Sequence, residues 1–289
     1  MVRSLATAMA ILPPLLWGST YLVTTELLPA DKPLSAAMLR ILPVGLLLTL
    51  LTRQLPDREH WPRLVVISLL CMAVFHWALF VSAYRLPGGL AALLVTSQPL
   101  LVAMLGYLFF GSRVTFKVAA GIVVGLGGVA LVLSAPSRLA WDTVGIFAAF
   151  SAALAMSLGT LLIKRWQLPI PVLAFTGWQL TIGGLALLPA VLVFEMPIGP
   201  LEARHLGGYL YLALLGTLLP YLLWFSALRY LDPVLISTLI LLSPLSAMVL
   251  GYVVLGQTLT SMQLAGAAAI LTGILVSNVP IGRFGKTRA

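Results

Sequence analysis

Long apolar runs separated by short polar joins dominate the pattern along this chain. A helix needs roughly 20 apolar residues to cross about 30 Å of hydrocarbon. Backbone groups in lipid must be paired within the protein, and these runs lack the strict alternation of a barrel strand, so the pattern predicts helices. Ten stretches qualify as membrane spans, approximately residues 5–25, 34–52, 62–84, 88–110, 116–134, 142–163, 170–194, 206–228, 233–255 and 260–281.

The composition places these helices in a membrane. Of the 289 residues, 61% are hydrophobic and only 9% are charged, whereas a soluble domain has about 25% charged residues. A chain this apolar could not cover a surface that faces water. The sequence therefore predicts an all-α integral membrane protein, with ten transmembrane helices surrounded by the lipid bilayer.

Basic residues are distributed unequally between the joins. The chain has 17 Lys and Arg against 8 Asp and Glu, but they stand singly, without the basic cluster that would indicate a nucleic-acid partner. Arg40 lies within a span, twelve others fall on one side of the ten-span arrangement, and Lys32, Arg85, Arg138 and Arg204 fall on the other. Because Lys and Arg accumulate in cytoplasmic joins, we expect both termini in the cytoplasm and a multi-pass protein of the inner membrane.

One segment of the chain occurs twice. Residues 97–111 read SQPLLVAMLGYLFFG and residues 242–256 read LSPLSAMVLGYVVLG, with six of fifteen positions identical at an offset of 145. The third, fourth and fifth spans therefore correspond to the eighth, ninth and tenth. Further matched positions are Ser82-Ala83-Tyr84-Arg85 with Ser226-Ala227-Leu228-Arg229 at offset 144, Gly121/Gly266 and Gly128/Gly273 at offset 145, and Gly45/Gly184 at offset 139.

A repeat unit of five spans has a consequence for topology. Because five is an odd number, the second copy enters the membrane in the opposite orientation. Many secondary transporters use such inverted repeats to form one substrate site near the midplane, between the two halves. We therefore expect two inverted five-helix repeats around a central cavity, residues 1–138 and residues 139–289.

The repeated segments, extended to residues 97–133 and 242–277, resemble the EamA family of the drug/metabolite transporter superfamily. The shared features are a proline early in one span, a glycine near its end, a short turn and a glycine-spaced span. The segment WGSTY at residues 17–21 resembles the first-span motif of the family, and Arg40 matches its second-span arginine. The resemblance implies a ten-helix carrier of small metabolites, similar to the bacterial exporters of aromatic amino acids.

The chain departs from the family pattern at two equivalent positions. The family often has a glutamate after the glycine that ends the fourth and ninth spans. Here these positions hold Ser112 and Gln257. A role assigned to that glutamate does not carry over to this chain.

Residues that could support enzyme chemistry are scattered. All eight carboxylates fall at or near span ends, no HExxH motif occurs, and Cys71 is the single cysteine. An enzyme site needs convergent groups, and the sequence gives no sign of one, of a metal site or of a cofactor. The two ionisable residues inside spans are Arg40 and His76, and each is as compatible with a structural role as with a contact to substrate.

Aromatic residues at matched depths in different spans indicate a substrate site. Trp17 and Tyr21 are one turn apart, and Trp77 and Phe80 correspond through the repeat to Tyr221 and Trp224. Single aromatic residues often belong to the belt at the lipid interface, but rings paired by the repeat favour a cavity for aromatic or cationic guests. The substrate-binding residues that we predict are Trp17, His76, Trp77, Phe80, Gln98, Tyr221, Trp224 and Ser243.

Prolines and glycines in the fourth and ninth spans predict hinges. Proline removes a backbone donor and clashes with the carbonyl four residues back, so Pro99 and Pro244 should mark local breaks. Gly88 and Gly89 precede the fourth span and complete the predicted hinge set.

These observations favour a secondary transporter that exports small metabolites, most of all amino acids with an aromatic preference. Two alternatives stay open from the sequence. One is a multidrug or nucleotide-sugar carrier of the same superfamily, and the other is a membrane enzyme acting on a lipid-linked substrate.

Overall fold

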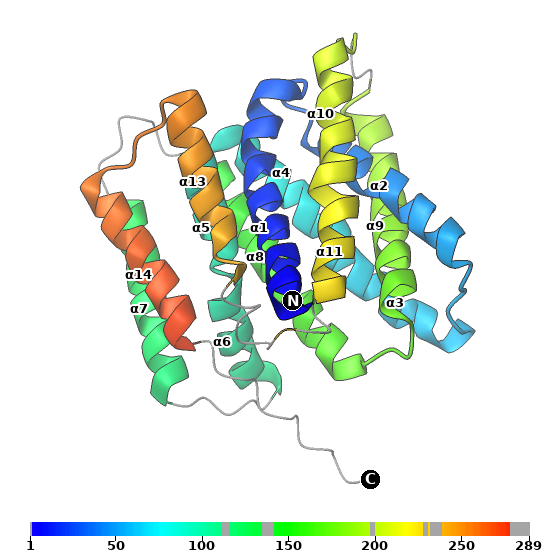
Figure 1. Ribbon diagram of the computed structural model, residues 1–289, viewed down its shortest axis with the longest axis horizontal. Coiled ribbons are helices and arrows are strands. Elements are labelled where there is room, and N and C mark those ends of the chain that lie inside the picture. Colours follow the sequence, from blue (N-terminus) through cyan, green and yellow to red (C-terminus); the bar gives the residue numbers. More distant parts are fainter. Residues whose placement is uncertain are drawn as a thin grey trace.

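The computed structural model describes residues 2–110, 116–134, 142–196, 200–227, 231 and 239–277. Its regular elements within these residues are all helices. The α-helices are labelled in Figure 1: α1 (Val2–Leu27), α2 (Pro33–Thr52), α3 (Trp61–Ser68), α4 (Phe75–Arg85), α5 (Gly88–Thr96), α6 (Gln98–Phe110), α7 (Phe116–Ser134), α8 (Thr143–Trp166), α9 (Val172–Phe194), α10 (Ala203–Ala213), α11 (Leu219–Ala227), α13 (Leu242–Leu255) and α14 (Ser261–Ser277). A 3-10 helix, η1 (Arg58–His60), precedes α3, and two π-helical segments join neighbouring α-helices: η2 (Leu69–Val74) between α3 and α4, and η3 (Leu214–Leu218) between α10 and α11.

Seven helical segments of the described chain are long and apolar enough to cross a membrane. They are Leu5–Leu27, Pro33–Thr52, Arg58–Arg85, Gly88–Phe109, Thr143–Trp166, Val172–Phe194 and Ala203–Trp224. Three shorter apolar helices occupy the fifth, ninth and tenth predicted spans: Phe116–Val132, Leu242–Leu255 and Ser261–Val276. The all-helical membrane class is thus confirmed, and the number of ten crossings stays a prediction.

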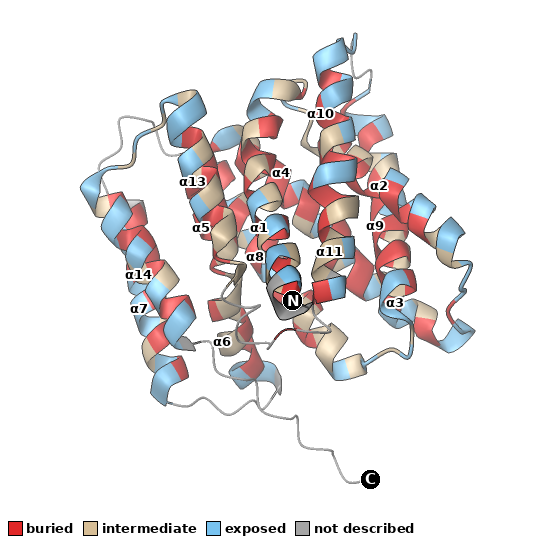
Figure 2. Cartoon of the chain, viewed as in Figure 1, coloured by how far each residue is buried: buried red, intermediate tan, exposed pale blue. Residues whose placement is uncertain are grey.

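Exposed and buried residues alternate along the helices (Figure 2), and many of the exposed residues are large and apolar. Leu50, Phe109 and Phe194 are each more than two-thirds exposed, at 71%, 68% and 77%. Exposed surface of this kind is costly in water and favourable in hydrocarbon. The distribution of side chains therefore agrees with helices that lie in lipid.

Helices α7 and α14 pack closely at one end of the molecule (Figure 1). A methyl group built on Gly128 would lie 2.7 Å from the backbone O of Gly266 and the backbone N of Ile270. A methyl group built on Gly273 would lie 2.6 Å from the backbone O of Gly121 and the backbone N of Gly125. The repeat offset of 145 relates Gly128 to Gly273, Gly266 to Gly121 and Ile270 to Gly125, so the two sets of contacts are equivalent. The same contacts show that the two helices run antiparallel.

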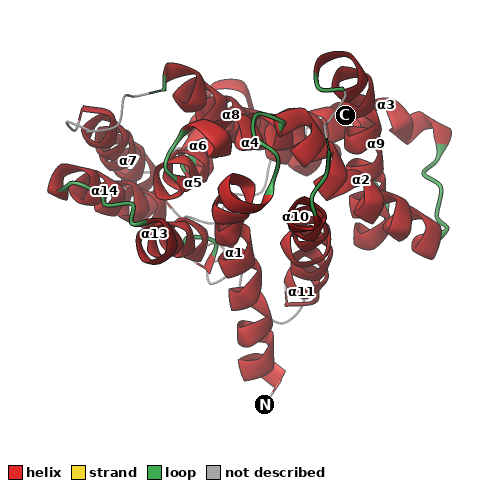
Figure 3. Ribbon diagram, turned by 90° about the horizontal axis from the view of Figure 1, so that it is seen from above, coloured by secondary structure: helices red, strands yellow, loops and turns green. Residues whose placement is uncertain are grey.

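Helices α2 and α9 form a second antiparallel pair, at the other end of the molecule (Figure 3). A methyl group on Gly45 would meet the backbone of Leu180 and Thr181, and one on Gly184 would meet Leu42. The pair is fastened at both ends. Glu195, after α9, accepts hydrogen bonds from the first amides of α2, and the indole N–H of Trp178 donates to the backbone O of Gln54 over 2.7 Å.

The third and eighth spans contain π-helical turns at matching places. At the repeat offset of 144, η2 (Leu69–Val74) falls on residues 213–218, and η3 covers Leu214–Leu218. A π turn widens the helix by one residue and is frequent at functional sites. These two turns therefore mark equivalent irregular points in helices that the sequence predicted to be continuous.

The fourth span is interrupted close to its proline. Helix α5 ends at Thr96, Ser97 is a turn residue, and α6 begins at Gln98, immediately before Pro99. The hydroxyl of Ser157 on α8 donates to the backbone O of Gln98 over 3.2 Å. In the ninth span, Pro244 is buried at the start of α13. The use of either proline as a hinge stays a prediction.

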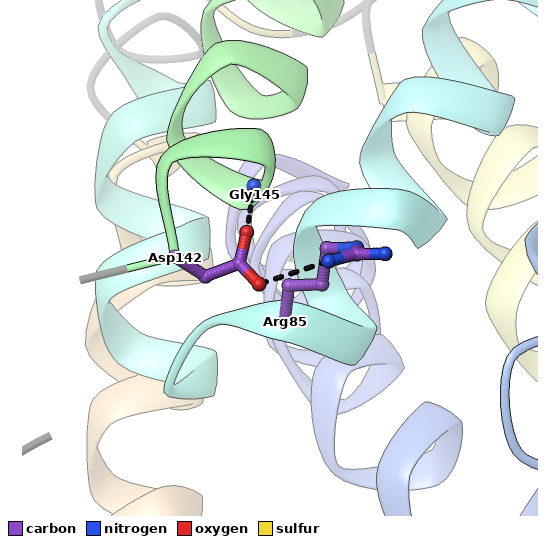
Figure 4. A network of polar contacts seen from close by, with 3 residues as sticks. All are labelled: Arg85, Asp142 and Gly145. Carbon is purple, nitrogen blue, oxygen red and sulfur yellow. Dashed lines mark hydrogen bonds and ion pairs between the residues drawn. The ribbon is translucent and has the colours of Figure 1, made fainter. Parts of the chain in front are cut away.

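Helix α8 begins with a polar cap outside the apolar region. The side chain of Asp142 accepts a hydrogen bond of 2.8 Å from the backbone N–H of Gly145 and pairs with Arg85 at 2.9 Å (Figure 4). The Gly145 N–H and the Arg85 guanidinium hold the pKa of Asp142 below its usual range. The end of α4 is thereby tied to the start of α8. The predicted boundary at residues 138 and 139 lies outside the described residues.

Candidate functional site

Arg40 lies where helices from both predicted halves of the chain meet. It is only 5% exposed. Its Nε donates to Oγ1 of Thr217 at 3.1 Å, one terminal nitrogen donates to Oγ1 of Thr20 at 3.2 Å, and the other donates to the backbone O of Gly216 at 2.9 Å. The guanidinium thus joins α1, α2 and η3 in the interior.

The sequence explains why the carbonyl of Gly216 accepts this bond. In a regular helix that oxygen would accept from the backbone nitrogen four residues later, which here belongs to Pro220 and carries no hydrogen. The π turn at Leu214–Leu218 further displaces the backbone at this point. A hydrogen-bond acceptor is therefore available inside the apolar region, and Arg40 occupies it.

Phe80 and His76 form one face of α4 beside Arg40. Phe80 is fully buried, and its ring centroid lies 5.9 Å from the Cζ of Arg40. His76, one turn earlier, is also buried, and its Nδ1 lies 2.9 Å from the backbone O of Met72. A carbonyl oxygen only accepts, so Nδ1 carries the proton of this bond. In a neutral ring, Nε2 is then an acceptor.

Three of the predicted rings come together on α1 and α11. The ring centroids of Trp17 and Tyr221 are 6.2 Å apart, and those of Trp17 and Trp224 are 5.5 Å apart. We refer to these three residues as the aromatic group. Both distances lie within the range at which aromatic rings attract one another.

The remaining predicted residues, Ser243, Gln98 and Trp77, lie on other helices or on another helix face than the aromatic group. Ser243 belongs to the first turn of α13, and a methyl group built on Gly18 of α1 would meet its backbone O. Gln98 starts α6, where its backbone contacts α8 instead. Trp77 is 42% exposed, on a part of α4 turned away from the His76–Phe80 face. The structure therefore places the backbone of Ser243 against α1 at Gly18, and it does not place Gln98 or Trp77 in the aromatic group.

Comparison with known proteins identifies the type of protein. The sequence profile of the EamA-like transporter family matches residues 4–134 and 143–279. Protein PecM of Dickeya dadantii (strain 3937) is 42% identical over 91% of this chain and 89% of its own length. The chain belongs to the EamA-like transporter family.

Two further relatives are similar to the chain at lower identity, and a solved structure resembles it in fold. A chloroplastic WAT1-related protein of Arabidopsis thaliana is 31% identical over 94% of this chain and 69% of its own length. The uncharacterized inner membrane transporter YedA of Escherichia coli (strain K12) is 26% identical over 93% of this chain and 89% of its own. One crystal structure covers 95% of this chain and 96% of its own, with a TM-score of 0.63 and 20% identity, a likeness in fold.

Membership in the EamA-like transporter family settles the general class of function. The protein is a multi-pass membrane transporter, and the alternative of a membrane enzyme is excluded because the family and its named relatives are transporters. A transporter of this family implies a small-molecule substrate and a lipid bilayer.

Gln257, where the chain departs from the predicted family pattern, contacts another helix. The side-chain oxygen of Gln257 accepts a hydrogen bond of 3.2 Å from the backbone N–H of Gly88, at the start of α5. Gly88 and Gly89 are both buried there, Gly88 against Tyr21 and Gly89 against Met248. Ser112, the equivalent position in the first half, lies outside the described residues.

The hydrogen-bond partners of Arg40 were not predicted from the sequence. Thr20 and Thr217 accept from its guanidinium, and Tyr211 shares a hydrogen bond of 2.8 Å with Ser19 nearby on α1. The one local signal was Pro220, which predicts an unpaired carbonyl at Gly216. The contacts themselves join residues that are 20 and 177 positions apart, a pairing that only the packing of the helices determines.

Proposed function

We propose that this EamA-like transporter exports small metabolites across the cytoplasmic membrane, with amino acids as the substrate class and aromatic ones preferred. The observation that carries this proposal is the aromatic group, in which Trp17 from the first half meets Tyr221 and Trp224 from the second. A site between halves can open alternately to either side, because relative motion of the halves exposes it.

The architecture that we propose is two inverted five-helix repeats that together make ten spans. Its support is the reciprocal contacts of α7 with α14 and of α2 with α9, together with the matched π turns η2 and η3. We further propose that both termini are cytoplasmic, in accordance with the asymmetry of basic residues in the joins.

In this orientation the aromatic group lies on the cytoplasmic side of Arg40. With a cytoplasmic N-terminus, α1 runs from the cytoplasm outward, so Trp17 lies nearer to the cytoplasm than Thr20, which binds Arg40. The eighth span runs in the opposite direction, so Tyr221 and Trp224 lie nearer to the cytoplasm than Thr217, which also binds Arg40. A substrate taken from the cytoplasm would meet the rings first and the guanidinium afterwards. Aromatic faces attract flat apolar groups and ammonium groups alike, and Nε2 of His76 offers a further acceptor to an amine.

Transport of labelled solutes by the purified full-length protein in liposomes tests this function. The panel is one aromatic amino acid, one aliphatic amino acid, one nucleotide sugar and one aromatic drug cation, with empty liposomes as the control. We expect flux of the aromatic amino acid to exceed that of the other three. A protein that moves the nucleotide sugar or the drug cation and neither amino acid belongs to the alternative carrier class, and the amino acid proposal is then wrong.

A further inference from the structure

Arg40 carries a buried positive charge without an anionic partner in the described part of the chain. Ion pairs that the structure shows include those of His60, Arg85 and Arg204, which lie at helix ends, and none of these includes Arg40. The three acceptors of Arg40 are two hydroxyls and a carbonyl, so they satisfy hydrogen bonds without neutralising the charge. A guanidinium has five N–H donors, which leaves two of them beyond the three bonds described.

A charge kept in this state is costly for a membrane protein. Insertion of an arginine at the centre of a span costs at least about 2.5–3.5 kcal/mol, so such residues usually face a pathway or a partner. Within the described residues, Arg40 is held by hydrogen bonds to neutral oxygens and by the ring of Phe80, and none of these contacts neutralises its charge. The positive charge therefore indicates a partner that is not part of the protein.

The aromatic group and Arg40 stand next to each other along two helices. Trp17 is three residues before Thr20 on α1, and Tyr221 is four residues after Thr217, so each pair shares a helix face. The spacing along the axis is about one turn, ~5.4 Å. A carboxylate and a ring joined by a few carbon atoms can span this distance, and the ring of Phe80 lies 5.9 Å from the guanidinium carbon.

We infer that Arg40 binds the anionic group of the transported molecule, so that the protein selects cargo in which a carboxylate stands next to a flat apolar body. This inference rests on the proposed function and deepens it. The planar guanidinium matches a carboxylate in shape and charge and binds it with two parallel hydrogen bonds. An aromatic amine without a carboxylate lacks the group that Arg40 recognises.

The second half of the chain provides a matched position without the charge. The offset of 139 that aligns Gly45 with Gly184 aligns Arg40 with Gln179. Gln179 is also 5% exposed, and its side-chain nitrogen has no hydrogen-bond partner within the described ranges. The anion-binding charge thus occurs once, and Gln179 offers a control for the loss of a buried polar group at an equivalent depth.

The experiment compares tryptophan, indole-3-propionate and tryptamine as labelled cargo of the full-length protein in liposomes. The first two carry a carboxylate, and the third has the same ring and an amine alone. We expect the wild type to move both acids and to move tryptamine about ten- to a hundredfold more slowly, the loss expected when a charged hydrogen-bonded partner is missing. Arg40→Gln should lose the preference for acids, Arg40→Lys should keep part of it, and Gln179→Leu should keep the wild-type ratio.

The results of this experiment distinguish failure of the inference about Arg40 from failure of the proposed function. Wild-type protein that moves tryptamine as fast as the acids overturns the inference and leaves aromatic transport intact, whereas flux of none of the three compounds overturns the proposed function. Folded Arg40→Gln protein with an unchanged ratio of acid to amine flux also overturns the inference. If Arg40→Gln does not fold, the ratio of acid to amine flux in the wild type and in Arg40→Lys still tests the inference. An arginine with only a structural role would leave both of these ratios near one.

Discussion

The buried carboxylate of Glu195 accepts a hydrogen bond of 2.7 Å from the backbone N–H of Ser35. Its other oxygen accepts from Leu34, and its own backbone O accepts from the ammonium of Lys32 at 2.7 Å. The residue that ends α9 therefore caps the start of α2. A negative charge is favourable there because the first amides of a helix are unpaired and carry partial positive charge.

Removal of this cap should destabilise the protein. Glu195→Leu leaves two buried amides unpaired, and hydrogen bonds to charged groups contribute about 1.5–3 kcal/mol each. We expect a clear fall in unfolding temperature in detergent, with a smaller fall for Glu195→Gln, which keeps one acceptor. Glu26, which is exposed, provides the control position. Equal stability of Glu195→Leu and wild type would contradict the capping role.

The bond between Gln257 and Gly88 makes a second testable link between helices. Gln257→Leu removes the acceptor and should cost about 0.6–1.7 kcal/mol, the range for side-chain hydrogen bonds between membrane helices. Gln257→Glu restores an acceptor and adds a charge that suits the start of α5. Thermal unfolding should therefore rank Gln257→Glu at or above wild type and Gln257→Leu below it. The reverse order would show that the bond does not contribute.

The antiparallel pair of α7 and α14 depends on small residues at the contact. Gly273→Val would drive a side chain into the backbone of Gly121 and Gly125, so we expect little folded protein. Gly127 faces open space, and Gly127→Ala should be tolerated or slightly stabilising, since alanine exceeds glycine in helix propensity by about 1 kcal/mol. Expression and monodispersity in size-exclusion chromatography measure both. Normal yield of Gly273→Val would rule out the close contact.

The contacts of Asp142 predict that the stability of the protein depends on pH. The Gly145 N–H and Arg85 lower the pKa of Asp142 in the folded protein, whereas the pKa of an aspartate in an unfolded chain is about 3.9. The stabilisation is therefore present above that value and lost as the pH falls through the lower folded pKa. Asp142→Asn should be less stable than wild type at pH 7, and the difference should shrink below about pH 4. A difference that grows in acid would contradict this sign.

The sequence predicted the apolar helices and assigned Trp17, Tyr221 and Trp224 to one candidate site, because apolar length and an internal repeat are properties of the chain itself. It did not predict the orientation of Trp77. Successive residues of a helix are rotated by about 100°, so the face that buries His76 and Phe80 turns Trp77 outward. The hydrogen bonds of Arg40 could not be predicted from the sequence either, since its bond to the backbone O of Gly216 lies in a π turn of another span.

The most direct test of the account measures the initial rate of labelled tryptophan efflux from liposomes that contain wild type, Trp17→Leu or Trp224→Leu, at equal amounts of folded protein. Trp224 also packs beside Ala6, Ala10, Ala227 and Leu231, so thermal stability is measured in parallel. If the aromatic group binds the substrate, both variants remain folded, and their rates fall about two- to tenfold, since stacked rings contribute about 0.5–1.5 kcal/mol beyond the area they bury. Unchanged rates in both folded variants, or losses that follow the loss of folded protein alone, would contradict it.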